Sequence, residues 1–383
     1  MSPSPTTKTG SATAQPDADT IEASQMKAWP YLLVYVVLSL IFVDFYRLTP
    51  VSPFFFLIFV FVMIPILDYF IGRDDYNPPA KVRKFLERRI SFRNITLMWL
   101  PFYVGMVSWG VFYGYGQCKT VAEKVSLIIN MGLVSAININ MSHELIHKHS
   151  RLEHWFGRIC LCITFYGHFT VEHLQGHHVN VSTEHDPASS KKGESLYAFL
   201  PRTIFGSIVS AWQLDAKTCN LLWAITGLMC LLVYPFGSVF FFAMQGIVGA
   251  IFLEIINYIE HYGLSRNPGE PVTPMHSWNA GDRLTNYILI KLQRHSDHHA
   301  NPGWRFQTLR SWPHSPQLPY GYATMVVISL IPPLWFSIMD PKVDQVKKYF
   351  AKLERENTLN QVFTNEYLQE HPEDMKFEHW KSK

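Results

Sequence analysis

Long apolar stretches alternate with polar loops along most of the chain, and this pattern predicts six membrane-spanning helices. A helix needs about 20 mainly apolar residues to cross the hydrocarbon core of a bilayer. Tryptophan and tyrosine at the ends of several stretches are typical of the membrane interface. The predicted spans cover residues 29–46, 54–72, 95–116, 123–142, 220–236 and 237–258.

Basic residues in the short loops indicate which side of the membrane each loop faces. Residues 72–94 carry seven Lys and Arg against three acids, and loops with such an excess remain in the cytoplasm. With six spans, both termini are then cytoplasmic, in a multi-pass protein of the cell inner (plasma) membrane. The polar segments that follow residues 142 and 258 are expected on the same side.

The remaining segments do not fit a simple span. Residues 1–28, rich in Ser, Thr, Pro and Ala, predict a disordered tail. The 13 residues 157–169 are too few to cross and predict a buried or re-entrant helix. Residues 320–339, which contain two prolines, favour an interfacial helix over a seventh span. Residues 346–383 are expected to be a charged tail behind a bundle and catalytic domain formed by residues 29–345.

Composition agrees with a membrane protein and excludes other classes. Of 383 residues, 48% are hydrophobic and only 16% are charged, which is the profile of a polytopic membrane protein. A net charge of +3 is too small to indicate a nucleic-acid partner. The five cysteines form no CxxC pair, so the chain encodes no iron–sulfur module. Any electron carrier must therefore be a separate protein.

Nine histidines gather in four clusters on the predicted cytoplasmic side. On a helix, residues three and four apart share a face, whereas adjacent residues diverge by about 100°. Adjacent histidines are therefore better placed to serve two metals than one. The clusters are His143 and His147; His173, His177 and His178; His261; and His295, His298 and His299.

The number of histidines favours two metal ions. Imidazole binds Fe, Zn, Cu and Ni, so the ligand type alone does not identify the metal. A single zinc uses three or four protein ligands and would leave five imidazoles unexplained. The alternative of a zinc-protease helix, with Glu144 as general base between His143 and His147, does not explain the later clusters. The other histidines are expected to be ordinary: His149, His154, His168, His185, His276, His314, His371 and His379.

Carboxylates beside the clusters are expected to orient the imidazoles and to offset the charge of two divalent ions. Glu144 and Asp297 lie inside histidine motifs. Glu254 lies within the sixth span, on one helical face with Asn257 and His261, and an ionisable residue at membrane depth is a functional candidate. We predict catalytic roles for Glu144, Glu254 and Asp297. Three further acids border the clusters, and each could equally be an ordinary surface residue: Glu172, Asp186 and Glu260.

At these motifs the chain resembles the integral-membrane di-iron alkane 1-monooxygenases (alkane omega-hydroxylases). The resemblance extends over about residues 30–345. It rests on the motifs His-Glu-Leu-Ile-His-Lys at 143–148, Glu-His-Leu-Gln-Gly-His-His at 172–178, Asn-Tyr-Ile-Glu-His-Tyr-Gly-Leu at 257–264 and Leu-Gln-Arg-His-Ser-Asp-His-His-Ala at 292–300. The last two distinguish this family from fatty-acid desaturases, which share the general layout. His185 departs from the family pattern, and we favour a surface turn there over a tenth ligand.

The resemblance implies an all-α membrane protein, a six-helix transmembrane bundle with a cytoplasmic histidine-rich di-iron domain. It also implies two Fe²⁺ ions bound by the nine histidines, and electrons from rubredoxin with its NADH-dependent reductase. Candidate residues for docking the acidic donor are Lys191, Lys192, Arg202, Arg294, Arg305 and Arg310.

The implied reaction is O2-dependent terminal hydroxylation of medium-chain n-alkanes to 1-alkanols. Methyl hydroxylation of fatty acids or xylene-like aromatics, fatty-acid desaturation, and a non-enzymatic metal sensor or transporter remain as alternatives. Chain-length preference would depend on bulky side chains in the channel, for which the candidates are Phe54, Phe55, Phe56, Phe59, Trp99 and Trp109.

Overall fold

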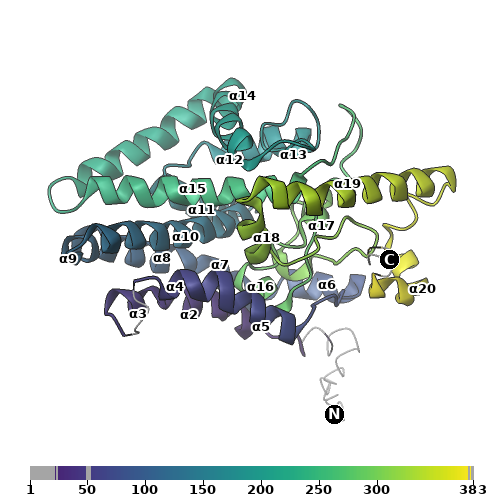
Figure 1. The fold of residues 1–383 in the computed structure, drawn as a ribbon, viewed down its shortest axis with the longest axis horizontal. Helices are drawn as coiled ribbons and strands as arrows, with labels where there is room; N and C mark the ends of the chain where they lie inside the picture. Colours follow the sequence, from purple (N-terminus) through teal and green to yellow (C-terminus); the bar gives the residue numbers. More distant parts are fainter. Residues whose placement is uncertain (1–21, 23–24, 49–52, 378–379, 381–383) are drawn as a thin grey trace, which may run out of the picture.

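The computed structural model describes residues 22, 25–48, 53–377 and 380, so most of the predicted N-terminal tail lies outside the described residues. The described part is all-helical, with two isolated β-bridges and no longer strand, which confirms the predicted class. Long helices run side by side at one end of the molecule, and short helices and loops form a cap at the other end (Figure 1).

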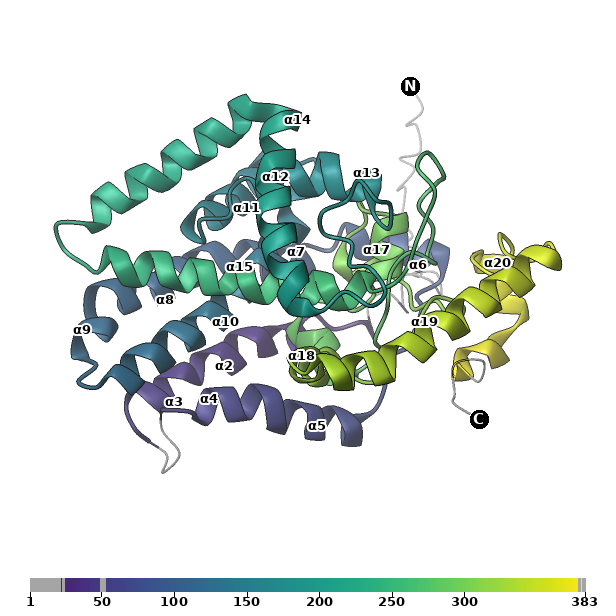
Figure 2. The same cartoon turned by 45° about the horizontal axis from the view of Figure 1, so that its top comes forward.

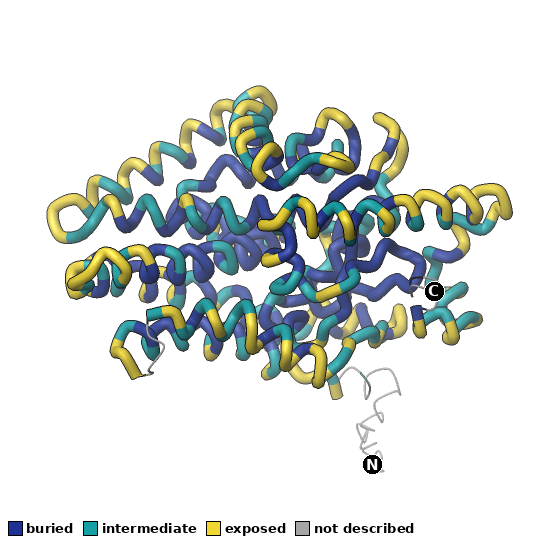
Figure 3. The backbone as a smooth tube through the Cα atoms, in the orientation of Figure 1, coloured by how far each residue is buried: buried dark blue, intermediate teal, exposed yellow. Residues whose placement is uncertain are grey.

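Among the described residues, four helices are long and apolar enough to cross a membrane, and two shorter apolar helices lie within the first two predicted spans. Figure 3 shows exposed positions along the outer sides of these helices and buried positions toward the cap. Exposed apolar side chains are expected where a bilayer, rather than water, is the solvent. The long helices are Ile90–Gln117, α10 (Val121–Ile146), α14 (Leu196–Val233) and α15 (Val239–His261), and the shorter ones are Trp29–Phe45 and Phe55–Ile71.

The centre of the bundle is the close pair α10 and α15. A Cβ atom on Gly132 of α10 would lie 2.2 Å from the side chain of Val248, and one on Gly249 of α15 would lie 2.5 Å from Ser135. Small residues allow membrane helices to approach closely. This packing fixes the ends of both helices relative to each other at the cap.

Several helices extend beyond their predicted boundaries. Helix α10 continues to Ile146 and α15 to His261, so the first and third histidine clusters lie on helix ends. Helix α14 begins at Leu196 rather than at residue 220, and non-helical dihedral angles at Asp215 divide it into two arms (Figure 2). The prediction missed the first arm because polar residues such as Arg202 and Asp215 interrupt its apolar pattern.

Helix α11 (Arg151–Ile163) turns back into the bundle after α10. The amide of Gln245 in α15 donates to the carbonyl of Ile163 at 3.1 Å. Gln245 precedes His261 by about 24 Å along the helix, at 1.5 Å per residue. The end of α11 therefore lies deep among the long helices, as expected for a re-entrant segment.

The helix expected at the membrane interface over residues 320–339 is interrupted in the structure. The structure has two helices here, α18 (Tyr322–Ser329) and α19 (Pro332–Arg355). Ile331 between them has extended dihedral angles, because a residue that precedes proline disfavours the helical region. In the C-terminal segment, α19 buries Val346, Phe350 and Leu353.

Short helices of the cap hold most of the predicted site. They are α6 (Ala80–Glu87), α12 (Phe169–Val171), the π-helix η4 (Glu172–His177), α13 (His178–Asn180), α16 (Arg283–Ile288), α17 (His295–Ala300), η5 (Phe306–Thr308), α20 (Asn365–Glu370) and η6 (Pro372–Lys376).

Candidate metal centre

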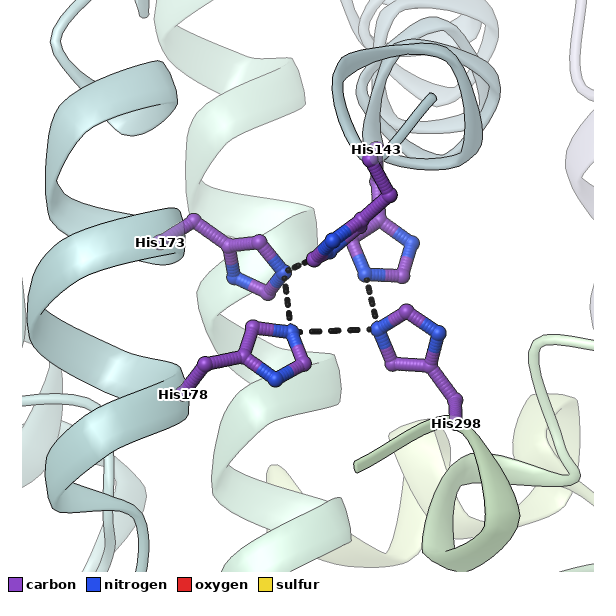
Figure 4. Close-up of side chains that lie close together, drawn as sticks. His143, His173, His178 and His298 are labelled. Carbon is purple, nitrogen blue, oxygen red and sulfur yellow. Dashed lines mark hydrogen bonds between the residues drawn. The ribbon is translucent and has the colours of Figure 1, made fainter. Parts of the chain in front are cut away.

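The nine histidines of the four clusters form two groups, and within each group the candidate ligand atoms lie within 4.8 Å of one another. Figure 4 shows four rings of the larger group facing one another. The first group is His143, His147, His173, His178 and His298, and the second group is His177, His261, His295 and His299.

Helix α10 contributes His143 and His147 to the first group. They are four residues apart, so their side chains share one face of the helix. His147 is the C-cap residue of α10, and its ring nitrogen Nε2 lies 3.1 Å from Nε2 of His173. The end of a central helix therefore places both imidazoles at the base of the cap.

A π-helix explains how the second cluster divides. Residues 172–177 form i→i+5 hydrogen bonds, which widen the helical turn by one residue. His173 and His178, five apart, then face the same way, and their Nε2 atoms are 3.0 Å apart. His177 points to the second group instead. Single π-turns inside helices frequently occur at functional sites.

The three histidines of α17 are distributed between the two groups as ordinary α-helical spacing predicts. His295 and His299, four residues apart, both join the second group, with 2.9 Å between their Nε2 atoms. His298 joins the first group and lies 2.8 Å from His143. His261, the last residue of α15, completes the second group at 3.3 Å from His295.

The spacing of the ring nitrogens fits bound metal ions. Two imidazole nitrogens about 2.1 Å from one ion and about 90° apart would be about 3.0 Å from each other. Neighbouring Nε2 atoms here are 2.8 to 3.3 Å apart. Hydrogen bonds explain the spacing less well, because Nε2 of His298 lies 2.8 Å from His143 and 3.1 Å from His178. A neutral ring nitrogen makes only one such bond.

Electrostatics also favours metal binding. Burial, and then the neighbouring imidazoles, hold the pKa values of His178, His298 and His299 well below the ordinary value. These rings are neutral at pH 7, so their lone pairs are available to a cation. All four rings of the second group are buried, whereas His147 and His178 of the first group are partly exposed.

His177 has a carboxylate partner of the kind that orients metal ligands. Its Nδ1 lies 2.9 Å from Oδ2 of Asp186, and both side chains are buried. Burial lowers the pKa of His177, but the Asp186 carboxylate outweighs it and raises the pKa to about 9. Nε2 of His177 is buried and has no hydrogen-bond partner within the described chain. It is the atom that faces the second group.

Glu260 is a second carboxylate at the site. Its Oε2 lies 3.2 Å from Nε2 of His295, and its Oε1 accepts a hydrogen bond from the Tyr322 hydroxyl at 2.7 Å. In the sequence, Glu260 and Asp186 stand out only as acids beside the clusters. The sequence feature that points to Glu260 is its place directly before His261. The feature that points to Asp186 is its place in the polar turn that follows His178.

The three acids predicted to be catalytic contact other partners. Glu144 pairs with Lys148 at 3.0 Å. Asp297 accepts from the Arg310 guanidinium at 2.7 Å and from the Trp312 indole at 2.8 Å. Glu254 accepts from Tyr166, Thr203 and Asn257. None of the hydrogen bonds described for these three acids reaches one of the nine histidines.

The histidines expected to be ordinary lie outside both groups where the structure describes them. His185 is in a turn, and its side chain is 63% exposed. His276 supports the site through its backbone, because its carbonyl lies 3.2 Å from Nδ1 of His261. His314 binds Asp374 at 3.0 Å. His379 lies outside the described residues.

Comparison with known proteins identifies the family. Residues 124–329 match the family model of fatty acid desaturases. Alkane 1-monooxygenase 2 of Alcanivorax borkumensis is 42% identical over 75% of this chain and 81% of its own length. Alkane 1-monooxygenase 2 of Pseudomonas aeruginosa is 40% identical over 87% of this chain and 88% of its own length.

A more distant relative has a different name. The xylene/toluene monooxygenase hydroxylase component XylM of Pseudomonas putida is 27% identical over 77% of this chain and 84% of its own length. The two 1-monooxygenases are more similar to this chain, at 42% and 40% identity against 27%. The chain therefore belongs to the alkane 1-monooxygenase family, within the wider fatty acid desaturase family.

Proposed function

We propose that this protein is an O2-dependent monooxygenase that hydroxylates medium-chain n-alkanes at the terminal carbon. The observation that carries the proposal is the position of two histidine groups at the base of the cap, the first of them next to an apolar cavity among the long helices. The names of the relatives point to the same reaction.

The metals are proposed to be two iron ions, each held by one histidine group. Nitrogen-rich sites with open positions suit iron that reacts with O2, and the nine imidazoles supply four or five ligands per ion. When bound, the irons supply the activation of O2. The protein holds the ligands, excludes water from the second group, and provides the carboxylates of Asp186 and Glu260.

The apolar cavity is the proposed alkane site. It has a volume of about 120 Å³ and lies between the first two apolar segments, α10, α15, α16 and α18. Of the six aromatic residues predicted to set chain length, Phe56 lines this cavity and the other five do not. Trp99 instead donates to Asn138 within the bundle.

Glu144, Glu254 and Asp297 are proposed to position the metal ligands rather than to react with substrate. Asp297 fixes the helix that carries three histidines, and Glu144 ties the end of α10 to the backbone of Phe306. Glu254 joins α15 to Thr203 of α14. Each acid connects a histidine-bearing helix to a neighbouring element.

We further propose six spans with both termini in the cytoplasm of an inner-membrane protein. Single cysteines in a cysteine-free background test this. Lys84→Cys and Lys191→Cys should react with an impermeant thiol reagent only from the cytoplasmic side, and Lys119→Cys only from outside. All three lysines are exposed. Labelling of residue 191 from outside would contradict the topology.

The electron donor is proposed to be rubredoxin, reduced by its NADH-dependent reductase, docking over His147 and His178. These two partly exposed imidazoles connect the first group to the surface. Five of the six predicted docking cations are already engaged: Lys192 with Asp344, Arg202 with Glu194, Arg294 with Asp74, Arg305 with Glu153 and Arg310 with Asp297.

The decisive experiment supplies purified protein with octane, ¹⁸O2, rubredoxin, its reductase and NADH. We expect 1-octanol that carries one labelled oxygen, with no octene. His298→Ala, which lacks a predicted metal ligand, is the inactive control. The same assay with xylene tests the aromatic alternative suggested by the XylM relative. Octene as the main product would favour a desaturase, and no O2 consumption would favour a metal-binding protein without enzyme activity.

A further inference from the structure

Asn140 lies between the apolar cavity and the first histidine group. Together with Leu289 and Leu292, it lines the apolar cavity. Asn140 and Leu292 also line a second cavity of about 10 Å³, whose other walls include His143 and His298. The turn from Leu289 to Leu292 and the Asn140 side chain therefore separate the alkane site from the metal ligands.

This turn has an unusual backbone. Ile290 and Lys291 are consecutive non-glycine residues with positive φ angles of 47° and 59°. A β-branched residue such as isoleucine rarely adopts this left-handed region. Strained residues persist only where the surrounding structure holds them, and such positions concentrate at functional sites.

Two of the hydrogen bonds that hold the turn share one carbonyl. The Leu289 carbonyl accepts from the side-chain amide of Asn140 at 2.8 Å and from the backbone N–H of Leu292 at 3.1 Å. The backbone N–H of Lys291 donates to the Asn286 carbonyl at 2.8 Å. Asn140 is the only one of these partners that comes from a long helix of the bundle. It thus ties the turn to the helix that carries His143.

We propose that Asn140 is a specificity-determining residue, which clamps the turn Leu289–Leu292 as a rigid partition so that only the terminal carbon of an alkane reaches the metal centre. This inference rests on the proposed function. A secondary C–H bond is weaker than a primary one, so selectivity for the terminal carbon must come from position. A displacement of about 1 Å in a reacting group changes rates by up to about 100-fold.

Two variants test the partition, with octane as substrate. Asn140→Leu keeps a side chain of similar volume but removes the amide that donates to the Leu289 carbonyl. Leu292→Ala shortens a side chain that separates the two cavities and leaves that hydrogen bond in place. In both we expect full iron content and a rise of at least about threefold in the fraction of 2-octanol, as expected for a small displacement of the chain. The control is Val327→Ala, which shortens an exposed side chain of α18 that does not line the cavity and should leave the product ratio unchanged.

The outcomes separate this inference from the proposed function. If the wild-type protein makes no octanol, the proposed function fails. If it makes 1-octanol and both variants keep its product ratio with full iron content, the partition is overturned while the function stands. Loss of iron from Asn140→Leu would likewise overturn Asn140 as a selectivity residue, because the clamp would then belong to the metal centre.

Discussion

His177 and His178 are adjacent in the chain, yet their imidazoles belong to different histidine groups. Their rings are inclined by 75°, with centroids 5.9 Å apart. His298 and His299 divide in the same manner, also at 75°. Each doublet thus joins the two proposed metal sites through a single peptide unit, so a movement of either backbone segment displaces ligands of both ions.

Removal of one histidine from a doublet should therefore release iron. We expect the wild-type protein to hold about two irons per chain, one for each histidine group. His178→Ala and His299→Ala should each hold about one iron or fewer. Iron per chain, measured on purified protein, checks this. His185→Ala is the matched control and should keep both irons, because His185 is exposed and outside both groups.

Asp186→Asn should weaken iron binding while the fold is preserved. The substitution removes the negative charge 2.9 Å from Nδ1 of His177 but keeps an oxygen that can accept a hydrogen bond. Loss of a carboxylate behind a metal-binding histidine typically lowers affinity by about 10- to 100-fold. Iron retention against increasing chelator measures the change. Unchanged retention would show that the carboxylate does not support the metal.

The helical spacing of the histidines predicted the division of the doublets, but not every partner. His143 with His147, and His295 with His299, follow from ordinary i, i+4 geometry. His173 pairs with His178 rather than His177 because the segment is a π-helix. A one-residue change in helical turn leaves no clear signature in a single sequence, so this pairing required the structure.

The sequence identified membrane segments better than the elements that support the site. Apolar runs predicted α10 and α15, and both are helices long and apolar enough to cross a membrane. The first arm of α14 and the turn at Ile290 and Lys291 were not predicted. Both depend on contacts between residues that are distant in the chain, such as the bond from Asn140 to Leu289.

Asp297→Ala should destabilise the protein and release iron from both sites. Asp297 is fully buried, and its carboxylate accepts hydrogen bonds from the Arg310 guanidinium and the Trp312 indole. Removal of one partner from a buried ion pair typically costs about 3–5 kcal/mol, because the other charge stays buried. Thermal inactivation and iron content measure the effect. Asp344→Ala, which removes an exposed partner of Lys192, is the control and should change neither.

The Glu153–Arg305 pair should make stability depend on pH. Glu153 is fully buried in α11 and receives two hydrogen bonds from the Arg305 guanidinium, at 2.8 and 3.2 Å. Burial raises the pKa of Glu153, but Arg305 and then Arg93 outweigh it and hold the pKa below its ordinary value. A carboxylate with a lowered pKa in the folded state stabilises the protein above its unfolded pKa, about 4.3. That stabilisation disappears as the pH falls through the folded-state pKa.

Glu153→Gln should therefore lower stability by about 1–3 kcal/mol at pH 7, the cost of a weakened buried hydrogen bond to a charged group. The difference from wild type should stay constant down to about pH 5 and shrink below it, because the wild-type carboxylate then also becomes neutral. Thermal inactivation midpoints of both proteins between pH 7 and pH 4 measure this. A difference that grows on acidification would contradict the assignment of a lowered pKa.

Since Arg305 is held inside this pair, reversing its charge should destabilise the protein equally at low and high salt. A residue that attracts the electron donor from a distance should instead show an effect that weakens with salt.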